Sequence, residues 1–177
     1  MDRFPQLYTP RLLLRKLEVE DVPSLVKEAN NPKIADRILN IPHPYREPDA
    51  VFRIGYVFRG FKEKSRYVFA IIHQATDSLI GEISLHLTSQ TQAQLGYWIG
   101  ETHWKQGYAS ESVQTILPFG FEQLSLDLIF ATCKEDNLAS IAVLRKNGLQ
   151  LHSTNGGIHQ FRLSANSFQN KDASSSS

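Results

Sequence analysis

The chain has 177 residues, of which 41% are hydrophobic and 21% are charged, and its 19 basic and 18 acidic residues leave a formal net charge of +1. This length is typical of one domain, and these proportions are ordinary for a globular protein. A dedicated nucleic-acid-binding protein usually carries a clear basic excess, which this chain lacks. The sequence has no signal-like apolar segment at its N-terminus and no run of about 18 apolar residues. We therefore expect a cytoplasmic protein without a nucleic-acid or membrane partner.

Cys133 is the single cysteine, and one cysteine cannot form an internal disulfide, which fits a reducing compartment. It lies in the apolar run Ile129–Cys133 (IFATC), where we interpret it as a small buried hydrophobe rather than a nucleophile. No cluster of cysteine and histidine residues has the spacing of a zinc site, so we expect no metal.

The first half of the chain is predicted to hold one strand and three helices after a lead-in over residues 1–8. Apolar residues at helical spacing and strand-like alternation define these elements. They are a strand over 11–17, helices over 18–30 and 33–39, a proline-rich loop over 41–48 and a helix over 49–61.

The second half predicts three consecutive strands, followed by alternating helices and strands. The ranges are strands 67–73, 79–87 and 93–99, helix 108–124, strand 128–133, helix 138–147, and strands 149–153 and 159–163. A meander followed by a strand–helix–strand crossover predicts a mixed α/β domain over residues 9–165. Its sheet would be mostly antiparallel, with about seven strands and helices on both faces. The polar tail over 166–177, which ends in four serines, is predicted to be disordered.

The segment between the strand over 93–99 and the helix over 108–124 predicts an anion site. The first turn of a helix has unpaired N–H groups and a partial positive charge, so it can bind phosphate without a basic side chain. Gly107, just before this helix, would allow a close approach of the backbone. The patterns GxxxxGK[ST] and GxGxxG after a strand are both missing, which argues against an ATPase or a Rossmann dehydrogenase.

Four segments together carry a family resemblance. They are Thr9–Arg15 (TPRLLLR), Leu95–Ile99 (LGYWI), Gln106–Glu111 (QGYASE), and Asp136–Ile141 (DNLASI) followed by Arg145–Leu149 (RKNGL). In this order and spacing the chain resembles the GNAT superfamily of acyl-CoA-dependent N-acetyltransferases, and within it the RimJ/RimL-type branch. The resemblance covers residues 9–163. It implies acetyl-CoA as co-substrate, held where the fourth and fifth strands of the sheet splay apart.

The resemblance also assigns the cofactor contacts. It implies that backbone groups near Trp98 and Ile99 bind the pantetheine arm, and that side chains of Asn137 and Ser140 lie at the cofactor. The pyrophosphate would be held by backbone N–H groups of the loop and helix start, from Lys105, Gln106, Gly107, Tyr108, Ala109 and Ser110. Read without the resemblance, Asn137 could be a simple helix N-cap and Ser140 an ordinary first-turn serine.

Acetyl transfer to an amine needs a neutral amine, a donor for the developing oxyanion and a proton for the leaving thiolate. The tyrosine that many superfamily members use as the acid is replaced by Leu144, so Ser140 becomes the candidate acid. Glu82 is the candidate base and His86 the alternative, since both lie on one face of the strand over 79–87. Glu101 and His103, on the loop before the cofactor turn, are further options.

His43 and Tyr45, in the proline-rich loop, are candidates for binding the acceptor. That acceptor is expected to be a protein N-terminus or a small amine. The alternative is a non-catalytic CoA-binding module, because Leu144, Trp104 and Lys105 all depart from the family pattern. A homodimer is possible, since dimers are common in the families that the chain resembles.

Overall fold

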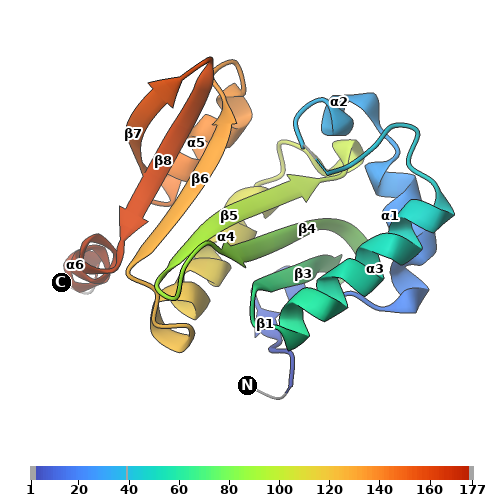
Figure 1. Ribbon diagram of the computed structural model, residues 1–177, viewed down its shortest axis with the longest axis horizontal. Helices are drawn as coiled ribbons and strands as arrows, with labels where there is room; N and C mark the ends of the chain where they lie inside the picture. Colours follow the sequence, from blue (N-terminus) through green and yellow to red (C-terminus); the bar gives the residue numbers. More distant parts are fainter. Residues whose placement is uncertain (1–2, 39, 176–177) are drawn as a thin grey trace.

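The computed structural model of the chain describes residues 3–38 and 40–175, and these form one mixed sheet with helices on both faces (Figure 1). Eight strands follow the order β1-β2-β3-β4-β5-β6-β8-β7. All neighbours are antiparallel except β5 and β6, which are parallel. The strands are β1 Leu7–Tyr8, β2 Leu12–Lys16, β3 Arg66–His73, β4 Ser78–Leu87, β5 Gln92–Ile99, β6 Leu128–Lys134, β7 Gln150–Asn155 and β8 Ile158–Ser164. This confirms the predicted fold class, with the two-residue β1 as an addition within the expected lead-in.

The helices divide between the two faces of the sheet. α1 (Val22–Ala29) and α3 (Glu47–Lys62) pack on one face, with the short α2 (Pro32–Ala35) between them in sequence. α4 (Tyr108–Pro118) and α5 (Leu138–Lys146) pack on the other face. A π-helical turn (Phe119–Gln123) extends α4, and the short 3₁₀ turns Val19–Asp21 and Glu101–His103 precede α1 and α4. We name the two faces after these helices.

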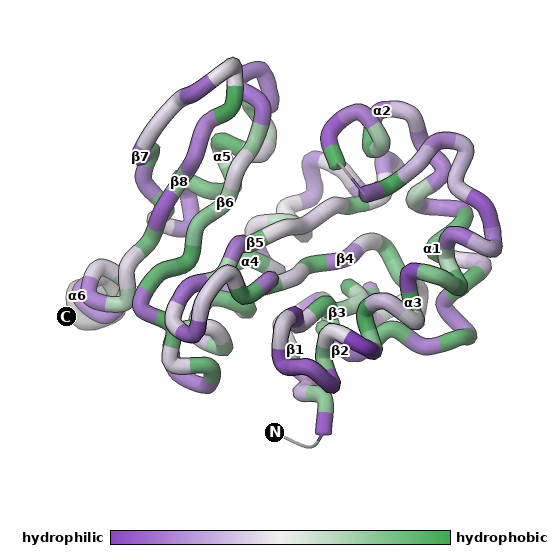
Figure 2. Tube along the Cα trace, viewed as in Figure 1, coloured by the Kyte–Doolittle hydropathy of each residue, from purple (hydrophilic) through white to green (hydrophobic). Residues whose placement is uncertain are grey.

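The sheet buries apolar side chains on both faces, because successive residues of a strand point in opposite directions. From β3, Phe69 and Ile71 enter the core under α4 and α5, whereas Val68 and Ala70 enter the core under α1 and α3. Figure 2 shows that the central strands carry far more hydrophobic residues than β7, which is exposed along its whole length. A continuous apolar run such as β3 is therefore a strand covered on both sides.

The parallel pair β5 and β6 separates soon after it begins. The two strands pair only from Gln92 opposite Leu128 to Gln94 opposite Phe130. Beyond these residues β5 continues to Ile99 and β6 to Lys134, and the strands diverge (Figure 1). This divergence is the splay that the resemblance implied. α4 begins beyond the end of β5, so a helix N-terminus lies at the open end of the splayed pair.

In the tail that the sequence predicts to be disordered over 166–177, the structure has helix α6 (Ala165–Ser175). Phe168 gives the physical reason, because its ring stacks on Phe121 with the centroids 4.9 Å apart. The polar composition of the tail gave no sign that this one aromatic residue would pack against the domain. Residues 176–177 of the predicted tail lie outside the described residues, as does residue 39 of the predicted helix over 33–39.

Two further expectations concern membranes and metals. Within the described ranges, no helix is both long and apolar enough to cross a membrane. Within the same ranges, no group of three or more histidine, cysteine, aspartate or glutamate residues is arranged to hold a metal ion.

Candidate active site

The loop before α4 curls so that backbone donors gather at the helix N-terminus. Lys105 and Gly107 both adopt left-handed backbone conformations, with φ of 60° and 84°. Gly107 is the N-cap of α4, and no side chain caps the first-turn N–H groups of Tyr108, Ala109 and Ser110. These N–H groups therefore remain available to an anion, as the sequence predicted. Lys105, which replaces a glycine of the family pattern, still takes the conformation that glycine adopts most easily.

Polar side chains of the N-terminal segment, which sequence reasoning missed, bind this loop and the start of α4. Arg11 forms an ion pair with Glu111 of α4 at 2.6 Å, and its guanidinium also donates to the Gln106 carbonyl at 3.0 Å. The Thr9 hydroxyl donates to the same Glu111 carboxylate. Burial opposes ionisation of Glu111, but the hydrogen bonds from Thr9 and Arg11 outweigh it and lower its pKa. The charge of Glu111, which would repel a phosphate, is thus neutralised by Arg11.

Trp104, the other departure from the family pattern, also has a structural role. Its indole Nε1 donates to the carbonyl oxygen of Ile99 at 2.6 Å and ties the loop to the end of β5. The substitutions at Trp104 and Lys105 are therefore accommodated by the loop.

The backbone polar groups of β5 alternate between β4 and the open side. The Gly100 N–H donates to the Ile80 carbonyl at 2.8 Å, and the Gly96 carbonyl accepts from the Ser84 hydroxyl at 3.3 Å. The Trp98 carbonyl also faces β4, because a Cβ added to Gly81 would lie 2.2 Å from it. Since polar groups alternate along a strand, those of Tyr97 and Ile99 face the open side. Of the two expected pantetheine contacts, Ile99 is thus turned toward the splay, and Trp98 is turned away from it.

Two hydroxyl groups meet beside the open side of β5. Tyr97 Oη lies 2.8 Å from Ser140 Oγ, at the start of α5. Burial raises the pKa of Tyr97, although the hydrogen bond to Ser140 opposes this, so the phenol stays protonated at neutral pH. The neighbouring Cys133 of β6 is buried, as predicted, and burial raises the pKa of its thiol. The Tyr97–Ser140 hydroxyl pair is uncharged and can donate a proton or a hydrogen bond toward the space between β5 and β6.

The remaining polar residues predicted on this side have structural partners. The Asn137 side chain accepts from the Ser140 N–H at 3.3 Å and is the N-cap of α5. Asn147, near the end of α5, donates to Ser110 Oγ at 3.1 Å and joins α5 to the first turn of α4. Leu144 is buried in the apolar core.

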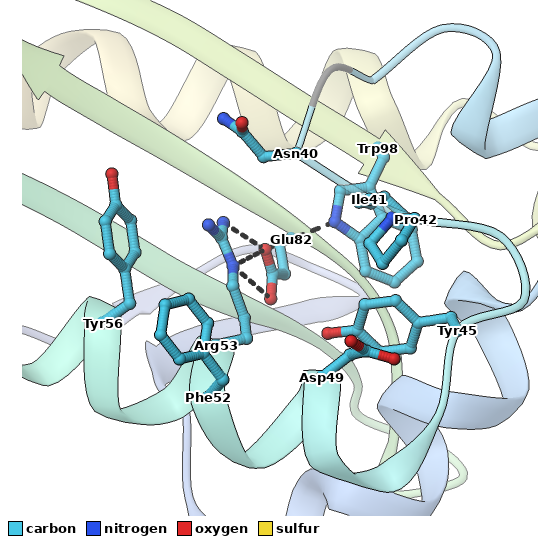
Figure 3. A pocket seen from close by; sticks show the side chains of 10 residues that line it. All are labelled: Asn40, Ile41, Pro42, Tyr45, Asp49, Phe52, Arg53, Tyr56, Glu82 and Trp98. Atoms are coloured by element: carbon cyan, nitrogen blue, oxygen red, sulfur yellow. Dashed lines mark hydrogen bonds and ion pairs between the residues drawn. The ribbon is translucent and has the colours of Figure 1, made fainter.

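On the α1/α3 face a cavity of about 340 Å³ opens against β4 and β5 (Figure 3). Its residues come from the loop before α3, from α3 itself and from the two strands. They are Asn40, Ile41, Pro42, Tyr45, Asp49, Phe52, Arg53, Tyr56, Glu82 and Trp98. The Tyr45 and Trp98 rings and the side chain of Phe52 border a charged centre, in which Glu82 and Arg53 point toward one another (Figure 3).

The carboxylate of Glu82, at the base of this cavity, is buried and accepts several hydrogen bonds. Its side chain is 4% exposed, and Arg53 Nη2 and Nε donate to its Oε2 at 2.7 and 3.1 Å. The indole of Trp98 donates to the same oxygen at 3.3 Å. Burial and then the Glu82 carboxylate raise the pKa of Tyr45 to about 12, so Tyr45 lines the cavity as a neutral donor. Arg53 is a site residue that sequence reasoning missed.

His86 lies on the same face of β4, as the alternation predicted, but at the level where β5 and β6 still pair. It is opposite Gln94, whereas Glu82 is opposite Trp98. His86 Nε2 lies 3.1 Å from Ser84 Oγ, which in turn donates to the Gly96 carbonyl. Burial, with smaller contributions from nearby arginines, lowers the pKa of His86 to about 4, so the ring is neutral at pH 7.

The other predicted residues lie apart from this centre. Glu101 is held by Asn31 and Lys33, which lower its pKa and tie the α2 segment to the loop before α4. His103 packs edge-on against the Tyr108 ring. His43 is exposed and lies outside the set of residues that line the cavity, whereas Tyr45 belongs to that set.

Comparisons with known proteins agree with this architecture. A family model, the Acetyltransferase (GNAT) domain, matches residues 11–150. An uncharacterized N-acetyltransferase of Bacillus licheniformis, p20, is 33% identical over 147 residues, which are 81% of this chain and 82% of that protein. A GNAT-family acetyltransferase from Bacillus anthracis superposes with a TM-score of 0.80 at 21% identity, covering 92% of this chain and 99% of that one.

A further solved structure is RimL, a ribosomal L7/L12 alpha-N-protein acetyltransferase in complex with coenzyme A. It superposes with a TM-score of 0.77 at 18% identity and covers 91% of this chain and 97% of that one. At such identities the solved structures show the shared fold. The family model and the Bacillus licheniformis relative go further, and the chain therefore belongs to the GNAT acetyltransferase family. Within that family it is an N-acetyltransferase of the RimJ/RimL type, which confirms the resemblance seen in the four sequence segments.

Proposed function

We propose that this chain binds acetyl-CoA in the splay between β5 and β6 and transfers the acetyl group to a primary amine that enters from the α1/α3 face. The observation that carries the proposal is the Tyr97–Ser140 hydroxyl pair beside the open side of β5. A thiolate that leaves during acyl transfer must be stabilised, and these two hydroxyls are the donors in position to do so.

The cofactor fits the donors at the splayed end. Backbone N–H groups of residues 105–110 would hold the pyrophosphate, and Arg11, whose guanidinium lies against the loop, would offset the nearby charge of Glu111. A Cβ on Gly107 would lie at an ordinary contact distance of 3.4 Å from Arg11 Nη2, so the positive φ of 84° rather than a lack of space favours glycine here. Along β5, the N–H and carbonyl of Tyr97 and the N–H of Ile99 would serve the pantetheine amides and the thioester oxygen, since the Ile99 carbonyl already accepts from Trp104. The Asn137 amide, at the start of α5, is the further side-chain contact that we assign to the cofactor.

Ser140 is the proposed acid, and Tyr97 positions it. The acceptor nitrogen forms a bond to the acetyl carbon and loses one proton to the base, while the carbon–sulfur bond breaks. The sulfur takes a proton from Ser140 Oγ, which solvent water then reprotonates. Tyr97 Oη lies 2.8 Å from that oxygen, and by donating a hydrogen bond to it can stabilise the negative charge that Ser140 Oγ acquires. A serine hydroxyl is a weak acid, but a thiolate is a good leaving group and needs only modest assistance.

The acceptor amine would reach the thioester through the cavity on the α1/α3 face. A protein α-amino group has a pKa of about 7.7–8.0, so a substantial fraction is already neutral near pH 7 and no strong base is needed. We propose His86, acting through Ser84, as the proton acceptor: its ring is neutral, and the Ser84 hydroxyl, 3.1 Å from Nε2, would turn its proton from the Gly96 carbonyl to the ring as it takes up the amine proton. Glu82 is the second candidate, although its oxygens are largely occupied by Arg53 and Trp98. A protein N-terminus fits these requirements directly, whereas a small alkyl amine, with a pKa nearer that of lysine at about 10.4, would depend more on the base.

The test is release of free CoA thiol from acetyl-CoA against a panel of amines, amino acids and peptides with free N-termini. Isothermal titration with CoA measures cofactor binding separately. The proposal predicts CoA binding together with acceptor-dependent thiol release. CoA binding without turnover on any acceptor would identify a non-catalytic module instead, and failure to bind CoA would exclude both functions.

A further inference from the structure

The guanidinium of Arg53 uses only part of its donor capacity within the protein. Nε and Nη2 donate to Glu82, and Nη1 donates to no residue in the described part of the chain. A guanidinium has five N–H donors in a planar fork, so the edge formed by Nη1 and the second hydrogen of Nη2 stays free. Arg53 lines the cavity on the α1/α3 face, and its side chain is 20% exposed. This free edge of Arg53 is therefore open to a molecule inside the cavity.

Two uncharged polar side chains line the same part of the cavity (Figure 3). The Tyr56 ring centroid is 5.8 Å from Arg53 Cζ, and the Tyr56 hydroxyl points the same way as the terminal nitrogens of the arginine. The side-chain amide of Asn40 borders the cavity from the loop before α3. Among the described residues, neither the Tyr56 hydroxyl nor the Asn40 amide has a hydrogen-bond partner. These groups and the free edge of Arg53 together offer several donors to one acceptor group, and a carboxylate accepts about four hydrogen bonds.

A second arginine adds a positive charge that no carboxylate balances. The guanidinium of Arg66, at the start of β3, lies 3.8 Å from the centroid of the same Tyr56 ring. Within the ranges that the structure describes, Arg66 forms no ion pair, and its buried Nε has no hydrogen-bond partner. Burial, and then the charges of Arg53 and Arg66, lower the pKa of His86. Two guanidinium groups thus flank one ring, and Glu82 is paired with only one of them, which favours an anion here.

The second carboxylate of the cavity has a partner of its own. Asp49 lies one turn before Arg53 on α3, and its Oδ2 accepts the Arg46 N–H at 2.8 Å, which caps the helix. Figure 3 shows Asp49 beside Tyr45, on the side of the cavity away from Tyr56. The cavity therefore has an acidic end near Tyr45 and a donor-rich end at the free edge of Arg53.

We propose that the acceptor amine carries a carboxylate, which the free edge of Arg53 binds with Tyr56 and Asn40 as further donors. This inference rests on the proposed function, in which the acceptor enters this cavity. Two parallel N–H···O bonds from a guanidinium fix the orientation of a carboxylate as well as adding affinity. Arg53 is then a specificity-determining residue for the acceptor as well as the partner of Glu82. An acidic side chain near a peptide N-terminus and the α-carboxylate of a free amino acid share this chemistry.

Matched pairs of acceptors test this on the wild-type protein. Peptides that begin with aspartate or glutamate are compared with peptides that begin with asparagine or glutamine, and free serine is compared with serine amide. Thiol release gives kcat/KM, and calorimetric titration into the protein–CoA complex gives binding without turnover. Hydrogen bonds to a charged group predict a preference of about tenfold or more for the carboxylate, in the peptide pairs or in the free amino-acid pair. The series that shows the preference identifies the source of the carboxylate.

The two readouts separate this inference from the proposed function. No preference for the carboxylate member in either series, in binding or in turnover, overturns the inference even if thiol is released. Preferential binding of the carboxylate member without thiol release from any acceptor would support the inference and contradict the proposed acetyl transfer.

Variants then assign the preference to Arg53. Arg53→Lys keeps a positive charge for Glu82 but has no planar fork, so the preference is expected to fall to near parity while CoA affinity stays at the wild-type value. Arg59→Lys is the matched control, since Arg59 is exposed on the same helix outside the cavity, and this variant is expected to keep the full preference. Tyr56→Phe removes one neutral donor and is expected to lower the preference by a smaller factor. An undiminished preference in Arg53→Lys would contradict the role of Arg53. If Arg53→Lys does not fold, the wild-type pairs and Tyr56→Phe still decide the inference.

Discussion

The two faces of the sheet use different chemistry around the same strand, β5. On the α4/α5 face the available groups are backbone donors and the uncharged Tyr97–Ser140 pair. On the α1/α3 face they are the buried Arg53–Glu82 ion pair and aromatic rings. Backbone groups suit a cofactor whose structure never changes, whereas side chains can be exchanged to suit different acceptors. Under the proposed function, acceptor choice can therefore change without loss of the proposed cofactor site.

The largest expected effect is on the α1/α3 face. Arg53→Met leaves the Glu82 carboxylate buried without its main partner, which typically costs about 3–5 kcal/mol of unfolding free energy. Since the Arg53 side chain is 20% exposed, we expect the lower end of this range. Urea denaturation measures the loss. The double variant Arg53→Met/Glu82→Met is expected to recover most of it, because well-packed apolar residues can replace a buried pair. A single variant as stable as the wild type would show that the pair has no structural role.

The next effect is catalytic and belongs to the α4/α5 face. Ser140→Ala is expected to lower kcat about 100-fold, the low end of the range for general acid catalysis, with little change in the KM for acetyl-CoA. Tyr97→Phe is expected to lower kcat less, because it removes only the group that positions Ser140. The matched control is Ser112→Ala, since the Ser112 hydroxyl is buried in α4 and has no hydrogen-bond partner among the described residues, so its removal is expected to be nearly neutral. Unchanged turnover in Ser140→Ala would remove this residue as the acid.

A smaller effect is expected at the cofactor loop. Gly107→Ala forces a Cβ into a left-handed conformation with φ of 84°, a strain of roughly 1–2 kcal/mol that should lower CoA affinity about tenfold. Gly156→Ala introduces a similar strain at φ of 55° in the β7–β8 turn, away from the cofactor loop. Titration calorimetry is expected to show weaker CoA binding for the first variant only. Equal affinities would mean that the loop conformation does not set cofactor binding.

A further expected effect, which appears only below neutral pH, is a pH dependence of stability. The pKa of His86 is lowered to about 4 from its ordinary value of 6.5, so the unfolded chain binds more protons between these values. The contribution of His86 to stability is therefore complete above pH 6.5 and is lost as the pH falls toward 4. His86→Gln is expected to flatten the fall in unfolding free energy over this interval. An identical pH profile in the variant would mean that groups other than His86 cause the fall in unfolding free energy.

The fold and the turn before α4 could be predicted because their signals are local in the sequence. The apolar run of β3 and the glycine before α4 each depend on a few consecutive residues. The helix α6 could not be predicted, since its anchoring contact joins Phe168 to Phe121, far away in the chain.

The side-chain pairs at the site were predicted only in part, for the same reason. Glu82 and Ser140 were identified, but their partners lie 29 and 43 positions away in the chain. Arg53 lies on a helix that looked like an ordinary apolar core helix, and Tyr97 lies within a strand motif. Which side chains meet across elements depends on how the helices dock on the sheet, and no local pattern specifies that.

The central claim is that the thioester lies at the Tyr97–Ser140 pair, with the acceptor on the opposite face. A crystal structure of the wild-type protein with CoA bound tests this most directly. The account predicts the CoA sulfur within hydrogen-bonding distance of Ser140 Oγ and the pyrophosphate against the N–H groups of residues 107–110. A sulfur located away from Ser140, or a CoA chain that does not enter the splay between β5 and β6, would contradict it.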